Sequence, residues 1–122
     1  MGSNPQYIYL VDDDLFVLEV TKEIIALSGL KVVAFTDPVA AFEAFRQERQ
    51  QPQVLVTDFN MPGMTGEELI ARCKAISPGL RTILISGTVE LAEVETHPVQ
   101  ADAFLAKPYL SVELLDLIKK LW

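Results

Sequence analysis

Short runs of apolar residues alternate along the chain with longer segments in which apolar residues recur every three or four positions. The short runs are rich in β-branched side chains and most are bounded by Asp, Gly, Pro or Ser, which is typical of buried strands. Their near-continuous apolarity indicates a parallel sheet that is covered by helices on both faces. The five predicted strands are Tyr7–Val11, Lys31–Phe35, Val54–Asp58, residues 82–86 and Ala103–Ala106.

The longer segments carry helix start signals, namely capping residues and a first-turn proline. In the first segment Val17, Val20, Ile24 and Leu27 recur at helical spacing, and Gly29 follows as a C-terminal stop. Four helices are predicted to begin after Asp14, at Asp37-Pro38, at the capping box of Thr65 and Glu68, and after Ser111.

The segment between the fourth and fifth strands gives a weaker helical pattern. Residues 89–96 are amphipathic over a short stretch, but His97 precedes Pro98, and the position before a proline disfavours helix. We therefore expect a shortened or distorted helix there. Because strand–helix–strand crossovers are right-handed, the whole pattern predicts a doubly wound (βα)₅ sandwich of three layers in the α/β class.

Length and composition bound the function. The chain has 122 residues, of which 50% are hydrophobic and 22% charged, as expected for one globular domain. We expect a single domain over residues 1–122, with residues 1–5 an N-terminal extension or a cloning remnant, and no output domain. The net charge of −7 opposes binding to phosphate backbones and anionic lipid, so direct contact with nucleic acid or membrane is not expected.

The single cysteine, Cys73, has no partner for an internal disulfide, and the N-terminus lacks the features of a signal peptide. No apolar run approaches the roughly 20 residues that a membrane-spanning helix needs. These features together predict a cytoplasmic location.

Chemistry-bearing side chains follow four of the five predicted strands. The first strand ends in Asp12-Asp13-Asp14, the third in Asp58 and the fourth in Ser86, and Lys107 follows the fifth. In open α/β sheets ligands bind beyond the carboxyl ends of the strands, so these side chains are expected to share one site.

Adjacent carboxylates repel one another unless a cation lies among them, and all-oxygen ligands suit Mg²⁺. Asp12, Asp13, Asp58 and the backbone carbonyl of Asn60 are the expected ligands, which leaves room for a phosphate oxygen. A carboxylate can attack a phosphoryl group to form an acyl phosphate. Lys107 and the Ser86 hydroxyl would then neutralise or hydrogen-bond the remaining oxygens.

From Tyr7 to Trp122 the sequence resembles a response-regulator receiver domain of bacterial two-component signalling. The resemblance rests on residues 8–14, 58–66, 85–87 and 104–108, in this order and spacing. It implies a flavodoxin-like fold with strand order 2-1-3-4-5. It also implies that Asp58 is the phosphoacceptor and that a phosphohistidine on a sensor histidine kinase or a phosphotransfer domain is the donor.

The same resemblance implies roles for the other site residues. Asp12 and Asp13 would hold Mg²⁺, and Lys107 would contact the phosphoryl group. Ser86 would be the switch hydroxyl and Phe104 the switch aromatic, which together alter a surface that binds a downstream protein. The only enzymatic chemistry implied is phosphorylation and dephosphorylation of the domain itself.

Residues 90–100 depart from the family pattern, so the output surface is less certain to transfer than the site. Two alternatives stay open: an interaction domain that works without phosphorylation, and a haloacid-dehalogenase-like phosphatase, whose motifs Asp12, Asp14, Ser86 and Lys107 loosely match. The sequence leaves open the cognate kinase, the output partner, a phosphorylation-dependent dimer, and whether the domain acts alone or within a longer protein.

Overall fold

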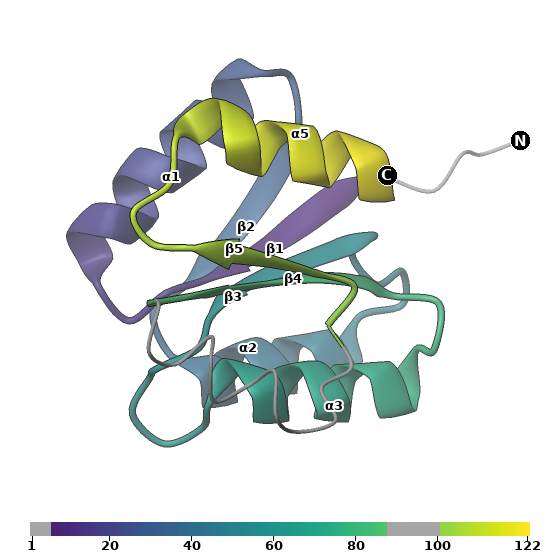
Figure 1. Ribbon diagram of the computed structural model, residues 1–122. Helices are drawn as coiled ribbons and strands as arrows, with labels where there is room; N and C mark the ends of the chain where they lie inside the picture. The colour runs from purple at the N-terminus through teal and green to yellow at the C-terminus, as the bar shows by residue number, and fades with distance from the viewer. Residues whose placement is uncertain (1–5, 88–100) are drawn as a thin grey trace, which may run out of the picture.

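A computed structural model describes residues 6–87 and 101–122 (Figure 1). Its strands form one five-stranded sheet in the order β2-β1-β3-β4-β5, and all neighbouring strands are parallel. This confirms the predicted sheet order, and only the start of the fourth strand differs, by one residue. The strands are β1 (Tyr7–Val11), β2 (Lys31–Phe35), β3 (Val54–Asp58), β4 (Arg81–Ser86) and β5 (Ala103–Ala106).

Among the described residues, four helices cover the sheet, with α1 and α5 on one face and α2 and α3 on the other (Figure 1). This arrangement confirms the predicted three-layer sandwich. None of the helices in the described part of the chain is long and apolar enough to cross a membrane. The helix expected over residues 89–96, His97 and the atypical residues 90–100 lie outside the described residues. The four helices are α1 (Leu15–Leu27), α2 (Pro38–Gln47), α3 (Gly66–Ile76) and α5 (Ser111–Leu121).

Three of the four predicted helix starts are confirmed in detail. The Asp14 carboxylate accepts hydrogen bonds from the first-turn N–H groups of α1, and Asp37 caps α2 in the same way. Thr65 and Glu68 form the expected capping box of α3. These side chains supply the acceptors that the first N–H groups of a helix lack.

The last helix begins one residue earlier than predicted. Ser111 is its first residue rather than its cap, and Leu110 occupies the capping position. The Glu113 carboxylate lies 2.7 Å from the Leu110 nitrogen and accepts its N–H. The helix therefore starts without a capping hydroxyl because the acidic side chain in its first turn reaches back to the backbone.

The buried face of α1 differs from the face that the predicted spacing marked. Leu18, Thr21 and Ile25 are its buried residues, whereas Val20 is 44% exposed and Leu27 is 79% exposed. The helix carries apolar side chains on most of its circumference, so two phases of the three-and-four spacing were available. Packing against β2 and α5 selects one of them and leaves the other as an exposed apolar surface.

Two hydrophobic clusters lie on opposite faces of the sheet. Along β1, Tyr7, Tyr9 and Val11 pack into the cluster on the α2 and α3 side, and Ile8 and Leu10 into the other. All residues of β1 and β3 are buried, which explains why these strands show no alternation of apolar and polar residues. The packed sheet holds the carboxyl ends of its central strands at one edge.

Candidate functional site

Three carboxylates meet at the carboxyl edge of the sheet. Asp12 and Asp13 directly follow β1, and Asp58 is the last residue of the neighbouring strand β3. One carboxylate oxygen from each lies within 4.8 Å of the others. Asp12 and Asp58 are 9% and 6% exposed, and Asp13 is exposed. The parallel pairing of β1 with β3 thus brings together the acids that the sequence marked.

This acid cluster is short of positive charge. Burial raises the pKa of Asp58, the charge of Asp13 raises it further, and the hydrogen bond from Lys107 only partly offsets these effects. Burial also raises the pKa of Asp12, although its carboxylate accepts the N–H of Asp14 at 2.9 Å. Packing buried carboxylates so closely is costly unless a cation compensates them. All-oxygen donors in a cluster of this size fit Mg²⁺.

Lys107 supplies one compensating charge. Its Nζ lies 2.7 Å from Oδ1 of Asp58, and its backbone N–H donates to the carbonyl of Ser86 at 2.8 Å. Partial burial lowers the pKa of the Lys107 amine, but the hydrogen bond and the charge of Asp58 outweigh this and raise it overall. The end of β4 therefore anchors the lysine, and the lysine keeps its charge beside Asp58.

Ser86 ends β4, the strand next to β3, and is 1% exposed. Its hydroxyl has no hydrogen-bond partner among the described residues. A buried hydroxyl without a partner costs about 1–3 kcal/mol. The site therefore holds a donor that is ready for an acceptor not supplied by the described part of the chain.

The other predicted site residues have simpler surroundings. Asn60 is exposed in the loop after β3, and Phe104 in β5 is 38% exposed. Asp14 serves as the cap of α1. The assigned roles of Asn60 and Phe104 stay predictions.

The exposed apolar surface on α1 was not predicted from the sequence. Beside Lys107, a groove of about 580 Å³ runs between α1 and the segment that leads into α5, and Val17, Val20, Ile24 and Tyr109 are among its lining residues. In the first turn of α1, just before these residues, Phe16 is 77% exposed. The signal for this surface was the apolar composition of α1 around its whole circumference, which exceeds what one buried face requires.

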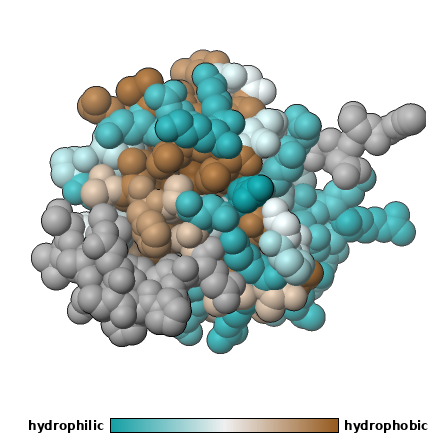
Figure 2. Space-filling view, turned by 45° about the vertical axis from the view of Figure 1, so that its right-hand side comes forward, coloured by the Kyte–Doolittle hydropathy of each residue, from teal (hydrophilic) through white to brown (hydrophobic). Residues whose placement is uncertain are grey.

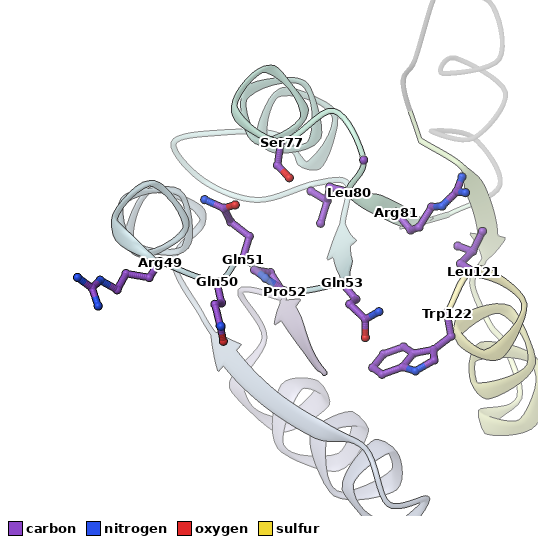
Figure 3. A pocket seen from close by; sticks show the side chains of 11 residues that line it. Arg49, Gln50, Gln51, Pro52, Gln53, Ser77, Leu80, Arg81, Leu121 and Trp122 are labelled. Carbon is purple, nitrogen blue, oxygen red and sulfur yellow. The ribbon is translucent and has the colours of Figure 1, made fainter. Parts of the chain in front are cut away.

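A second hollow, of about 540 Å³, lies at the opposite edge of the sheet, where β3 and β4 begin. Figure 3 shows that the side chains of Arg49 and Arg81 point away from each other, while Gln53 lies near Trp122. The Trp122 indole N–H donates to the Gln6 side chain at 3.2 Å. The described residues that line this hollow include neither an acid cluster nor a convergent set of charges, whereas the other edge of the sheet carries both the carboxylates and Lys107.

The comparison with protein families settles the class. The family model of the response regulator receiver domain matches residues 8–119. The chain therefore belongs to the response regulator receiver domain family, in agreement with the resemblance seen in the sequence.

The curated relatives differ in length. The C4-dicarboxylate transport transcriptional regulatory protein DctD of Pseudomonas aeruginosa is 35% identical over 93% of this chain, but the match spans only 24% of DctD. The sporulation initiation phosphotransferase F of Bacillus subtilis is 28% identical over 93% of this chain and 90% of its own length. The chain thus matches about a quarter of the length of DctD and nearly all of phosphotransferase F.

Solved structures support the same fold. A CheY-like receiver domain protein from Methanospirillum hungatei is 27% identical, with a TM-score of 0.82 over 94% of this chain and 91% of that chain. The response regulator TrrA from Thermotoga maritima, crystallised with Mg²⁺ and BeF, has a TM-score of 0.85 at 22% identity, covering 96% of this chain and 99% of that chain.

Proposed function

We propose that this domain accepts a phosphoryl group on Asp58 and thereby switches a surface that binds a partner. The observation that carries the proposal is the carboxylate of Asp58, which lies both in the acid cluster and 2.7 Å from the Lys107 amine. Among the described residues, the ion pair of Lys107 is made with Asp58 and not with Asp12 or Asp13. Asp58 is the carboxylate placed beside a positive charge that can contact an incoming phosphoryl oxygen.

In the proposed reaction, an oxygen of Asp58 forms a bond to phosphorus while the bond between phosphorus and the donor histidine nitrogen breaks. The donor is a phosphohistidine of a sensor histidine kinase or a phosphotransfer domain. Lys107 neutralises part of the charge on the phosphoryl oxygens, and the Ser86 hydroxyl donates to another. The reaction requires no other nucleophile from this chain.

Asp12, Asp13, Asp58 and the backbone carbonyl of Asn60 are the proposed ligands of Mg²⁺. The shortage of positive charge among the three carboxylates supports this assignment. When bound, Mg²⁺ supplies a positive charge that offsets the carboxylates and the phosphoryl oxygens. The buried oxygens of Asp12 and Asp58 would hold such an ion at the end of β1 and β3.

The proposed switch begins at Ser86, whose buried hydroxyl gains an acceptor when Asp58 carries a phosphoryl group. Phe104 on β5 responds by turning inward. Figure 2 shows hydrophobic side chains gathered on the face where β5 and α5 lie. At the start of α5, Leu110 and Val112 are more than half exposed. This face is the proposed docking surface for the downstream protein.

The groove beside α1 supports a protein rather than a small molecule as the natural donor. It is lined mainly by apolar side chains and lies next to Lys107. A helix of the donor that packs its apolar side into this groove would bring its phosphohistidine close to Lys107 and Asp58.

The wider role is also a proposal. One relative, DctD, is a transcriptional regulatory protein and the other is a sporulation initiation phosphotransferase, so the domain is proposed to act in cytoplasmic signalling, with an output protein or an output domain that reads its phosphorylation state. The net charge of −7 argues against direct nucleic-acid contact by this domain. The receiver match over residues 8–119 favours this function over a haloacid-dehalogenase-like phosphatase.

The chemistry of the linkage tests the proposal. After treatment with a phosphohistidine donor protein and Mg²⁺, borohydride reduction and peptide mass spectrometry should find homoserine at position 58. An exposed carboxylate, Asp116, should be unmodified in the same digest. Homoserine at position 12 or 13 instead would contradict the assignment of Asp58.

A further inference from the structure

Gly66, the first residue of α3, lies directly against the end of β3. A Cβ at this position would lie 2.2 Å from the backbone oxygen of Asp58 and 2.9 Å from Cδ1 of Leu84. The positive φ values among the described glycines occur at Gly29 and Gly63, so Gly66 is not required for an unusual backbone conformation. It is required because the carbonyl of Asp58 occupies the space of a side chain.

The backbone around this carbonyl is fixed from several sides. The Gly66 N–H donates to the carbonyl of Phe59 at 2.8 Å, and the Phe59 N–H donates to the carbonyl of Ile85 at 2.8 Å. The Thr57 hydroxyl donates to the carbonyl of Asp58 at 2.9 Å. The start of α3, the end of β3 and the end of β4 are therefore joined through the backbone of Asp58 and Phe59.

We propose that Gly66 is a positioning residue for the phosphoacceptor, an inference that rests on the proposed function. Because Gly66 has no side chain, the start of α3 packs directly against the carbonyl of Asp58. This contact sets the positions of the Asp58 carboxylate and of the Asn60 carbonyl further along the loop. A methyl group at position 66 would have to push the two backbones apart by roughly 1 Å, a misplacement that typically slows a reaction about 100-fold. Gly66 thus acts on the site without touching the phosphoryl group.

The test compares Gly66→Ala with Gly79→Ala, because a Cβ at Gly79 meets nothing within 4 Å. The rate of phosphorylation by acetyl phosphate and the Mg²⁺ affinity by calorimetry are measured on each. We expect Gly66→Ala to lose about 100-fold in rate and to bind Mg²⁺ more weakly, and Gly79→Ala to stay within about twofold of wild type.

A double variant distinguishes an effect of Gly66 on the site from an effect on core packing. In Gly66→Ala combined with Leu84→Val, the contact with Leu84 Cδ1 is removed and the clash with the Asp58 carbonyl remains. The double variant is expected to stay slow and to bind Mg²⁺ weakly. Recovery of rate and affinity in the double variant would place the effect of Gly66 in core packing and overturn the inference.

If Gly66→Ala does not fold, Thr57→Val tests the same carbonyl without a clash, because it removes the hydroxyl that donates to Asp58. Slower phosphorylation and weaker Mg²⁺ binding support the inference, and wild-type values overturn it. The two proposals fail differently. An unlabelled wild type contradicts the proposed function, whereas a labelled wild type matched by Gly66→Ala contradicts only the positioning role.

Discussion

Replacing Asp102 with asparagine is expected to destabilise the fold at neutral pH. This residue precedes β5, and its Oδ2 lies 2.8 Å from the Thr82 nitrogen and 2.9 Å from the Lys74 Nζ. Its own N–H donates to Thr82 at 3.1 Å. These contacts join the start of β5 to β4 and α3, and the other end of β5 leads to Lys107 of the site.

The magnitude follows from the charge and the burial of this network. Hydrogen bonds to charged groups contribute about 1.5–3 kcal/mol each, but asparagine keeps one acceptor oxygen. The side chains of Asp102 and Lys74 are 21% and 15% exposed, so solvent screens only part of the ion pair. We expect Asp102→Asn to lower the free energy of unfolding by about 1–2 kcal/mol, which lowers the Tm by about 5–10 °C.

The pKa of Asp102 predicts how the effect of this substitution on stability changes with pH. Burial acts to raise the pKa of Asp102, but the hydrogen bond and the charge of Lys74, together with the hydrogen bonds from Thr82, outweigh it and hold the pKa below the usual 3.8. A lowered pKa in the folded state contributes stability above the unfolded value, and this stability is lost as the pH falls through the folded value. The gap between wild type and Asp102→Asn should therefore close toward acid pH.

The assay is urea unfolding followed by circular dichroism at pH 7 and at acid pH. The exposed Asp116 on α5 provides a control, because Asp116→Asn should change stability by less than about 0.5 kcal/mol. The reasoning is refuted if Asp102→Asn equals wild type at pH 7, or if its deficit is as large below the folded pKa as at neutral pH.

Three further results are expected. A Mg²⁺ concentration ten times its Kd should stabilise the wild type by about 1.4 kcal/mol, and Asp13→Asn should remove most of this gain, so equal Tm shifts in both proteins would contradict the metal site. Phe16→Asp, on the exposed side of α1, should slow phosphorylation by a donor protein at least about tenfold; it should leave acetyl phosphate labelling unchanged, and an equal loss with both donors would contradict a docking role. Ser86→Ala removes a buried hydroxyl that has no partner among the described residues, and it should leave the unphosphorylated fold as stable or raise the free energy of unfolding by about 1 kcal/mol in urea titrations, whereas a large loss would show that the hydroxyl is already bonded.

The sequence carried enough information to predict the sheet and most of the site. Strands buried on both faces leave an uninterrupted apolar run, and β1 and β3 are fully buried, as such a run predicts. Parallel strands end at one edge, so polar residues at the ends of neighbouring strands had to meet. Asp12, Asp13 and Asp58 do meet there, and Lys107 reaches Asp58.

Features that depend on tertiary contacts were not predictable in this way. The buried face of α1 is decided by what packs against the helix, and its apolar circumference allowed Val20 to be assigned inward when it is exposed. The start of α5 depends on where the Glu113 carboxylate reaches. Gly66 at the start of α3 lies directly against Asp58 at the end of β3. The spacing of residues along the chain does not predict a distance between two separate elements.

The most direct test of the central claim is intact-protein mass spectrometry after incubation with acetyl phosphate and Mg²⁺. Wild type, wild type with EDTA and Asp58→Ala are compared. The account predicts one phosphoryl group on the wild type, which both EDTA and Asp58→Ala abolish. Retained labelling of Asp58→Ala would contradict the assigned acceptor, and a wild type that stays unlabelled even with a phosphohistidine donor would indicate an interaction domain that works without phosphorylation.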